Sequence, residues 1–324
     1  MSMLRYGWLL AALAMAAAPA QGAAPAPYPA KFVRFIVPYA PGGSSDVLAR
    51  TLGQKLGDAL GQTFIVDNRP GAGSMIGTDI AAKSIPDGYT IILSDMPHTI
   101  NPSIYPKVPY DPVKDFSPIS VIGVSPMFLF AHVSVQAQNV KDFIALAKAR
   151  PGKIAIASGG TGATTHLMAE LLQSNAGIQL IHVPYKGAGP ALTDVVAGQI
   201  PVTFTSMATA ASQVKSGRLR ILGVTSAKRL PAFPDVPTFA ESGVPGMVVE
   251  HWWGVMAPAG VPRPVIDKLH GAIVTAVNSA DLRERFATLA VEPKTNTPEE
   301  FRALLASDVK RWGKVVKDAG IKSE

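Results

Sequence analysis

Two glycine-rich stretches, one in each half of the chain, combine residue types that bind small anions. Each follows a strand-like run and precedes a helix-like run. Glycine lets backbone N–H groups turn toward one point, hydroxyl groups add donors, and a helix N-terminus favours negative charge. One such stretch alone is more typical of hydroxyl side chains that cap a helix, so the repetition favours an anion site. The stretches read Pro41-Gly42-Gly43-Ser44-Ser45-Asp46 and Ser158-Gly159-Gly160-Thr161-Gly162-Ala163-Thr164-Thr165-His166.

Catalytic and metal sites are weaker interpretations of the same chain. No two histidines stand at the HxH or HxxxH spacing of metal ligands, and no Walker loop or nucleophile elbow is present. The chain has no cysteine, which excludes disulfides, thiolate metal sites and cysteine nucleophiles. A triad of Ser44, Asp46 and His166 stays open as an alternative. We expect no catalytic residue, no cofactor and no metal.

Composition and the N-terminus point to an exported globular protein. The 324 residues are 48% hydrophobic and carry a net charge of +7. This balance excludes disorder, and the length predicts about two domains. The positive charge is scattered, which argues against a nucleic-acid partner. Arg5, the apolar run from Trp8 to Ala18 and the small residues after it predict a cleaved signal peptide over 1–24. Without a cysteine for a lipid anchor, the mature chain is expected in the periplasm.

The elements that position the two stretches follow from alternating strand and helix patterns, which predict an α/β fold with parallel strands. Five prolines between Asn101 and Pro118 predict an irregular segment. Thr297-Pro298-Glu299-Glu300 predicts the capped start of a C-terminal helix, and Pro190 is expected at the first position of another helix. Strands are predicted at 32–37, 63–66, 89–93, 126–131, 153–157, 180–183, 202–204 and 219–224, and helices at 46–60, 74–82, 141–149, around 167–172 and from 263 onward.

Seven short motifs, in order along the chain, together resemble one family. This is the Bug family, the periplasmic solute receptors of tripartite tricarboxylate transporters. The resemblance covers essentially all of the chain after the predicted signal peptide. The motifs are Pro41-Gly42-Gly43-Ser44-Ser45-Asp46, Asn68-Arg69-Pro70-Gly71-Ala72-Gly73, Pro86-Asp87-Gly88-Tyr89-Thr90, Val183-Pro184-Tyr185-Lys186-Gly187, Lys215-Ser216-Gly217-Arg218-Leu219-Arg220, Pro234-Asp235-Val236-Pro237-Thr238 and Ala257-Pro258-Ala259-Gly260-Val261-Pro262.

The resemblance implies a two-lobed periplasmic binding protein of type II-like fold, with two α/β domains joined by two crossover segments. Domain 1 would comprise residues 25–126 and 250–324, and domain 2 residues 127–249. Such a receptor captures a small organic carboxylate in the cleft between the lobes. It delivers this anion to the integral membrane subunits of the transporter and is expected to be a monomer. A cleft hydrolase and a periplasmic sensor for a signalling partner remain alternatives.

The resemblance also implies which residues contact the ligand. Many members of the family carry an acidic residue after the strand at 202–204, where this chain has Thr205-Ser206-Met207. This departure favours a dicarboxylate or an aromatic carboxylate over an amino acid. At Gly43 we expect a backbone conformation that a Cβ would disfavour, and His98 is expected in a loop beside the site. The predicted ligand-binding residues are Pro41, Gly42, Gly43, Ser44, Asp46, Ser74, Ser94 and Met96 from one lobe, and Ser158, Gly160, Thr161, Gly162, Thr164, Thr165, His166 and Ser206 from the other.

Overall fold

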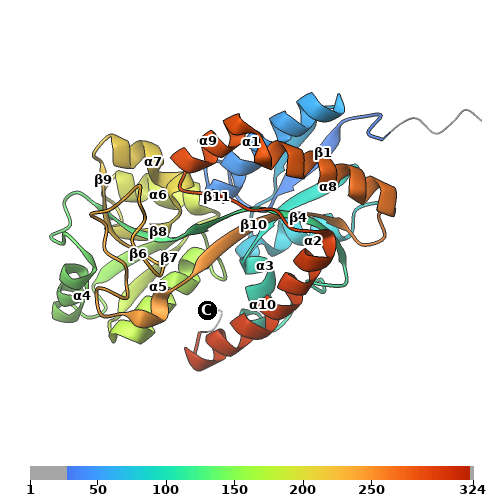
Figure 1. Ribbon diagram of the computed structural model, residues 1–324. Helices are drawn as coiled ribbons and strands as arrows, with labels where there is room; N and C mark the ends of the chain where they lie inside the picture. The colour runs from blue at the N-terminus through green and yellow to red at the C-terminus, as the bar shows by residue number, and fades with distance from the viewer. Residues whose placement is uncertain (1–27, 322–324) are drawn as a thin grey trace, which may run out of the picture.

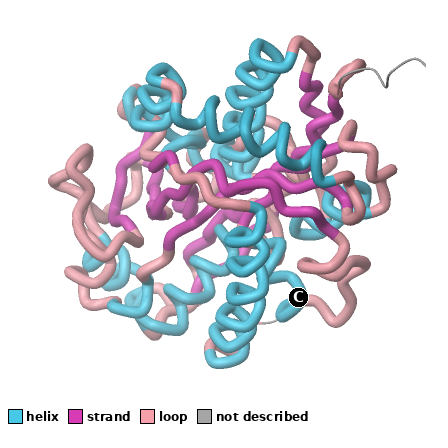
Figure 2. Tube along the Cα trace, turned by 45° about the vertical axis from the view of Figure 1, so that its right-hand side comes forward, coloured by secondary structure: helices cyan, strands magenta, loops and turns pink. Residues whose placement is uncertain are grey.

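The structure, a computed structural model, describes residues 28–321 (Figure 1). Its strands form one six-stranded and one five-stranded sheet, and helices lie on both sides of the strands (Figures 1 and 2). The predicted signal peptide over 1–24 lies outside the described residues. Among the described helices, none is long and apolar enough to cross a membrane.

The six-stranded sheet mixes strand directions. Its order is β11-β4-β10-β3-β1-β2. β1 (Val33–Val37) pairs in parallel with β2 (Phe64–Asn68) and β3 (Thr90–Asp95). β10 (Glu250–Pro258) runs antiparallel between β3 and β4 (Phe116–Pro126), and the short β11 (Glu292–Pro293) closes the edge. The prediction of parallel strands is confirmed for β1, β2 and β3 and was wrong for β10, which returns from the other sheet without a crossover helix of its own.

The five-stranded sheet has the order β7-β6-β8-β5-β9. β6 (Ile154–Ser158) pairs in parallel with β7 (Leu180–Pro184) and β8 (Val202–Thr205). β5 (Phe128–His132) runs antiparallel to both β8 and β9 (Leu219–Val224). The predicted strands of this half are present to within two residues at each end, because alternating or fully apolar runs mark each of them.

The chain passes between the sheets twice, and the two passages are hydrogen-bonded to each other. The first is Met127 between β4 and β5, and the second follows β9 and ends at β10. Thr225 joins them: its Oγ1 accepts from Met127 N at 2.8 Å and donates to Val249 O at 2.8 Å. Its own N–H donates to Met127 O at 2.9 Å, and Val249 N donates to its carbonyl at 3.1 Å.

Helices connect the strands and cover them. In chain order they are α1 (Ser44–Leu60), η1 (Ala72–Ser74), α2 (Met75–Ala82), α3 (Pro97–Ile104), α4 (Val140–Ala149), α5 (Thr164–Ala176), α6 (Ala188–Val196), α7 (Met207–Lys215), η2 (Pro245–Met247), α8 (Arg263–Asn278), α9 (Ala280–Thr288) and α10 (Pro298–Asp318). The predicted capping box is confirmed, since Thr297 Oγ1 accepts from Glu300 N and the Glu300 carboxylate accepts from Thr297 N.

Two proline-based predictions were wrong. The segment expected to be irregular from Asn101 contains the end of α3, with Pro102 inside the helix. Buried Ile100 and Ile104 hold this helix against the core, so packing outweighs the missing N–H. Pro190 is the third residue of α6 rather than its first, because Gly187 is the N-cap. Its missing N–H still falls in the first turn, where no helical partner exists.

The tandem tryptophans of β10 belong to the core on both faces of the sheet. Trp252 and Trp253 are both buried and pack in different apolar clusters, as the period of two along a strand requires. Trp252 Nε1 donates to Asp308 Oδ2 of α10 at 2.8 Å, and its ring meets Phe301 edge to face. Gly254 of β10 lies beneath the Phe301 ring, which a Cβ at that position would overlap.

This close approach predicts that Gly254→Ala lowers the free energy of unfolding by about 1–3 kcal/mol, because the added methyl forces α10 away from β10. Gly271→Ala, in helix α8, is the matched control. A Cβ at this position meets nothing within 4 Å, so the change should raise the free energy of unfolding by about 0.5–1 kcal/mol. Denaturant titrations measure both. Equal stability of the Gly254 variant and the native protein would contradict the packing described.

Candidate functional site

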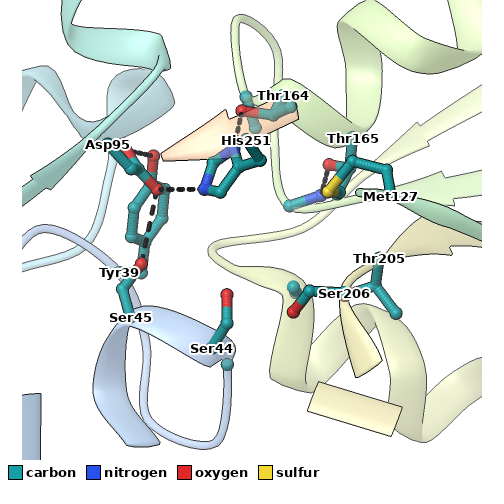
Figure 3. A pocket seen from close by; sticks show the side chains of 14 residues that line it. Tyr39, Ser44, Ser45, Asp95, Met127, Thr164, Thr165, Thr205, Ser206 and His251 are labelled. Carbon is teal, nitrogen blue, oxygen red and sulfur yellow. Dashed lines mark hydrogen bonds and ion pairs between the residues drawn. The ribbon is translucent and has the colours of Figure 1, made fainter. Parts of the chain in front are cut away.

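A cavity of about 440 Å³, counting the space that opens to solvent, lies where the two sheets face each other (Figure 3). Residues of both sheets and their helices form its wall. They are Tyr39, Gly43, Ser44, Ser45, Asp95 and His251 on the side of the six-stranded sheet, and Met127, Gly159, Ala163, Thr164, Thr165, Ala188, Thr205 and Ser206 on the other.

Four helices begin at this wall. Gly43, Ala163 and Ser206 are the N-caps of α1, α5 and α7, and Ala188 is the first residue of α6. None of the four N-termini has a hydrogen bond from a capping side chain. The N–H groups of a first helical turn have no helical partner and carry partial positive charge. Since no lysine or arginine is among the lining residues, these helix ends supply the positive potential of the cavity.

Ser206 contributes a hydroxyl that has no partner. Its side chain is 1% exposed, and its Oγ finds no hydrogen-bond partner among the described residues. Leaving a buried hydroxyl unpaired costs free energy, so this atom is available to a molecule in the cavity. Ser44 lies across the cavity from Ser206, at the start of α1 (Figure 3).

Asp95, at the end of β3, is the one carboxyl group among the lining residues. Tyr39 donates its hydroxyl to Oδ1 at 2.9 Å, and Ser45 Oγ donates to Oδ2 at 3.3 Å. The side chain is almost fully buried. This burial raises the pKa of Asp95 to about 7, although the two hydrogen bonds act in the opposite direction.

His251 connects Asp95 to the opposite side of the cavity. Its Nε2 lies 3.7 Å from Asp95 Oδ2, and its Nδ1 lies 3.1 Å from Thr164 Oγ1 at the start of α5 (Figure 3). Burial lowers the pKa of His251 to about 3, so the imidazole is neutral at physiological pH. The contact with Asp95 is therefore not an ion pair, and a line of polar groups crosses from β3 through β10 to α5.

The structure brings together some of the predicted ligand-binding residues at the cavity. These are Gly43, Ser44, Thr164, Thr165 and Ser206. Thr165 Oγ1 accepts from Gly159 N at 2.7 Å and so shapes the second glycine-rich loop.

Other predicted residues lie in two surface grooves next to the cavity. Pro41 and Gly42 line one groove, opposite Gly189 of α6. Ser74, Gly160 and Thr161 line the other groove, which they share with Tyr39 and Tyr105.

The remaining predicted residues support the loops from behind. Asp46 accepts hydrogen bonds from Gly42 N, Arg50 and Asn68, which fixes the first loop. Ser94 is buried on the opposite side of β3 from Asp95, because successive strand side chains alternate. Met96, the N-cap of α3, is buried in an apolar cluster.

The second loop is braced in the same way. Ser158 Oγ lies 2.6 Å from His182 Nε2 and accepts from Gly160 N. Gly162, at φ +81°, donates its N–H to His166 Nδ1 at 3.3 Å, and the His166 ring stacks on His182. Burial lowers the pKa of His166 to about 4.

Two expectations for individual residues were wrong. Gly43 has φ −83° and ψ 171°, an extended conformation open to any residue, whereas Gly42 has φ +88°. The turn into α1 is therefore completed one residue before the N-cap. His98 lies in α3 rather than in a loop at the cavity, with Nε2 2.7 Å from Pro112 O and its ring stacked on Tyr110.

The structure does not assemble the triad of Ser44, Asp46 and His166. Asp46 is engaged by Arg50 and Asn68, and His166 packs on His182 behind the second loop. Across the described range 28–321, no group of three histidine, aspartate or glutamate side chains is placed to hold a metal ion.

Sequence reasoning missed several lining residues. Tyr39, Ser45, Gly159 and Ala163 lie in or beside the two predicted loops, and Ala188 and Thr205 begin or precede helices, so each carried a local signal. Asp95 lies between the predicted residues Ser94 and Met96, and Met127 and His251 lie at the predicted domain boundaries, but no local pattern marked these three side chains themselves. Their positions depend on the pairing of β10 with β3 and on the passage between the sheets.

A family model described as tripartite tricarboxylate transporter family receptor matches residues 48–321. The chain belongs to this family. Its members are solute-binding receptors, and the resemblance carried by the seven motifs is thereby confirmed.

Individual relatives extend the match over nearly the whole chain. Protein BugT of Bordetella pertussis is 40% identical over 297 residues, 91% of this chain and 91% of BugT. The solved periplasmic binding protein BugD is 35% identical with a TM-score of 0.89, covering 91% of this chain and 100% of that one. R. palustris Rpa4515, solved with adipate, is 34% identical with a TM-score of 0.88, and the match covers 91% of this chain and 99% of that one. The predicted fold class of a two-lobed periplasmic binding protein is confirmed.

The conformations of the two neighbouring glycines predict unequal effects of alanine. Gly42→Ala should lower the free energy of unfolding by about 1–2 kcal/mol, because a side chain at φ +88° is strained. Gly43→Ala should lower the free energy of unfolding by less, because its Cβ would lie 3.6 Å from Gly189 N, which is an ordinary van der Waals contact. Thermal and denaturant unfolding compare the pair, and a larger loss at Gly43 would contradict the loop geometry.

Proposed function

We propose that this receptor binds a small organic carboxylate in the cavity, in the periplasm, and delivers it to the membrane subunits of a tripartite tricarboxylate transporter. The observation that carries this proposal is the convergence of four uncapped helix N-termini on a cavity whose lining has no lysine or arginine. The adipate bound to Rpa4515 and the pattern of residues 1–24 support the same role. The protein acts as a monomer and without catalysis.

The cavity suits an anion that also has an apolar part. Met127, Ala163 and Ala188 give the wall methyl and thioether groups between the hydroxyl and N–H donors. A ligand with one carboxylate at the helix ends and a short alkyl chain or ring beside Met127 would match both the polar and the apolar parts of the wall. A dicarboxylate or an aromatic carboxylate therefore remains the proposed ligand class.

We propose that residues 25–126 with 250–324 and residues 127–249 act as two lobes that close over the ligand. Each lobe offers only a few donors, worth about 1.5–3 kcal/mol each when charge-assisted, so neither is expected to retain the anion alone. Contacts between the lobes support a closed state. Ala40 N donates to Lys186 O at 2.9 Å, and Tyr105 donates its hydroxyl to Thr161 O at 2.6 Å.

A second function draws on one observation, the order Thr164, His251, Asp95, which has the sequence of groups found in a hydrolytic triad. The separation of 3.7 Å between the imidazole and Asp95 and the raised pKa of that carboxyl weaken this alternative. Turnover of carboxylic esters at a catalytic rate, lost in Thr164→Val, would favour a hydrolase over a receptor.

A thermal-shift screen of mono-, di- and aromatic carboxylates, with adipate included, tests the proposed function. A bound acid should stabilise the folded protein by about 2.7 kcal/mol at a hundredfold excess over Kd. Neutral amides of the same acids serve as controls and should have no effect. If no acid raises Tm, the proposal is wrong. Loss of growth on the confirmed acid after gene deletion separates a transport role from a sensory one.

The unpaired hydroxyl predicts that Ser206→Ala raises the Kd of the confirmed acid roughly tenfold to hundredfold, the equivalent of about 1.5–3 kcal/mol for one charge-assisted hydrogen bond. Ser212→Ala, an exposed serine on the same helix α7, is the matched control and should bind as the native protein does. Calorimetry measures both. Unchanged affinity in the Ser206 variant would remove this hydroxyl from the site.

The contact between the lobes predicts that Gly189→Ala holds the protein open. A Cβ at Gly189 would lie 2.6 Å from Pro41 O and 2.9 Å from the Gly42 carbonyl carbon, both rigid main-chain atoms of the other lobe. Affinity for the confirmed acid should fall while Tm of the ligand-free protein changes little. Small-angle scattering should show a smaller radius of gyration on ligand binding for the native protein alone. Equal contraction of the variant would contradict this closure.

A further inference from the structure

Asp95 places a carboxyl group inside a cavity for which we propose a carboxylate ligand. The side chain is 5% exposed and forms part of the wall (Figure 3). An ionised Asp95 and an ionised ligand would bring two negative charges into one enclosed space. Such a pair repels strongly where water is excluded, and the usual outcome is that one of the two carboxyl groups keeps a proton.

The side chains around Asp95 do not supply a compensating positive charge. Tyr39 reaches it from the segment after β1, Ser45 from α1 and His251 from β10. Tyr110, from the segment before β4, lies close enough to interact electrostatically with Tyr39 and Asp95, and burial raises its pKa to about 12, so it is neutral as well. Burial lowers the pKa of His251 to about 3 and raises that of Tyr39 well above its usual value, so both are neutral at physiological pH. No lysine or arginine is among the residues of the wall.

The hydrogen bonds of Asp95 leave room for a proton that points to the ligand. Oδ1 accepts from Tyr39 at 2.9 Å, the shorter of the two hydrogen bonds of this carboxyl group. Oδ2 accepts the longer bond from Ser45 at 3.3 Å and lies 3.7 Å from His251 Nε2, beyond hydrogen-bond distance. A proton on Oδ2 therefore has no strong acceptor among these neighbours and is free to be donated into the cavity.

We propose that the receptor binds its anionic ligand together with one proton, which is held on Asp95, so that Asp95 meets the ligand as a neutral hydrogen-bond donor. This inference rests on the proposed carboxylate ligand. It makes Asp95 a residue that determines specificity: the cavity accepts an anion by taking up a proton, and it disfavours anions at high pH. The raised pKa of Asp95, about 7, means that part of the ligand-free protein already carries this proton.

The direction of the pH dependence follows from linkage. Below about pH 6 Asp95 is protonated before binding, so affinity should be constant as long as the acid itself is ionised. Above the free-state pKa a proton must be taken up with each ligand, so affinity should fall by up to tenfold per pH unit. At pH 7.5 most of one proton should be absorbed per ligand bound.

Calorimetry of the native protein at pH 7.5 in HEPES and in Tris counts this proton, because the two buffers differ in ionisation enthalpy. The probe is adipate if it raises Tm, and otherwise the acid with the largest shift in the screen. Asp95→Asn, which imitates the neutral acid, should bind that probe with an affinity close to that of the native protein at pH 6. It should absorb no proton, and its affinity should stay constant from pH 6 to 8.5.

Asp308→Asn is the matched control. Asp308 is also buried, with a pKa raised by burial, but it receives its hydrogen bond from Trp252 and lies outside the cavity. This variant should absorb the same fraction of a proton as the native protein.

Several results would overturn the inference. Tight binding by the native protein without proton uptake would do so, whether or not Asp95→Asn folds. Release of a proton would show that Asp95 ionises against a cationic group of the ligand, such as an ammonium. Loss of binding in a folded Asp95→Asn variant would show that the ionised carboxylate is required. If no acid binds to the native protein between pH 5 and 8, the proposed function fails and this inference falls with it.

Discussion

The start of four helices at one cavity is the constraint on which the rest of the structure depends. Each of these helices, α1, α5, α6 and α7, follows a strand. The strands that precede them are β1 in one sheet and β6, β7 and β8 in the other, and each pairs in parallel with a neighbour. Parallel strands end at the same edge of a sheet, so the helices that follow them begin there as well. Two such edges facing each other concentrate main-chain N–H groups around a small volume. Charged side chains are then unnecessary for holding an anion, and water can be excluded without burying a cation.

The enclosure of the cavity also shifts the pKa values of its ionisable side chains in the directions that favour their neutral forms. Burial disfavours charge on an isolated imidazole or carboxyl, and His251 and Asp95 respond in opposite directions with the same result. Thr164, the neutral His251 and Asp95 thus form a line of polar groups between the two halves of the molecule. Such a line contributes orientation and hydrogen bonding at a lower desolvation cost than an ion pair would incur.

Local sequence patterns predicted the parts of this structure that depend on near neighbours. The glycine-rich loops, the strands between them and the capped start of α10 all carry their signal within about ten residues. β4 and β10, by contrast, are paired strands separated by more than one hundred residues of sequence. The prolines and glycines within them interrupt the apolar pattern by which a strand is recognised. Asp95 and His251 come together only through that pairing. The prediction for Gly43 was wrong because the sequence of a Gly-Gly pair does not show which of the two residues has the positive φ.

Thr225 joins the two connections between the sheets, and this has a mechanical consequence. A single threonine bonds Met127 on one connection and Val249 on the other through both its side chain and its main chain. The connections therefore cannot slide past each other without breaking at least two of these four hydrogen bonds. We therefore expect the two connections, which are held by the same threonine, to bend together if one half moves against the other.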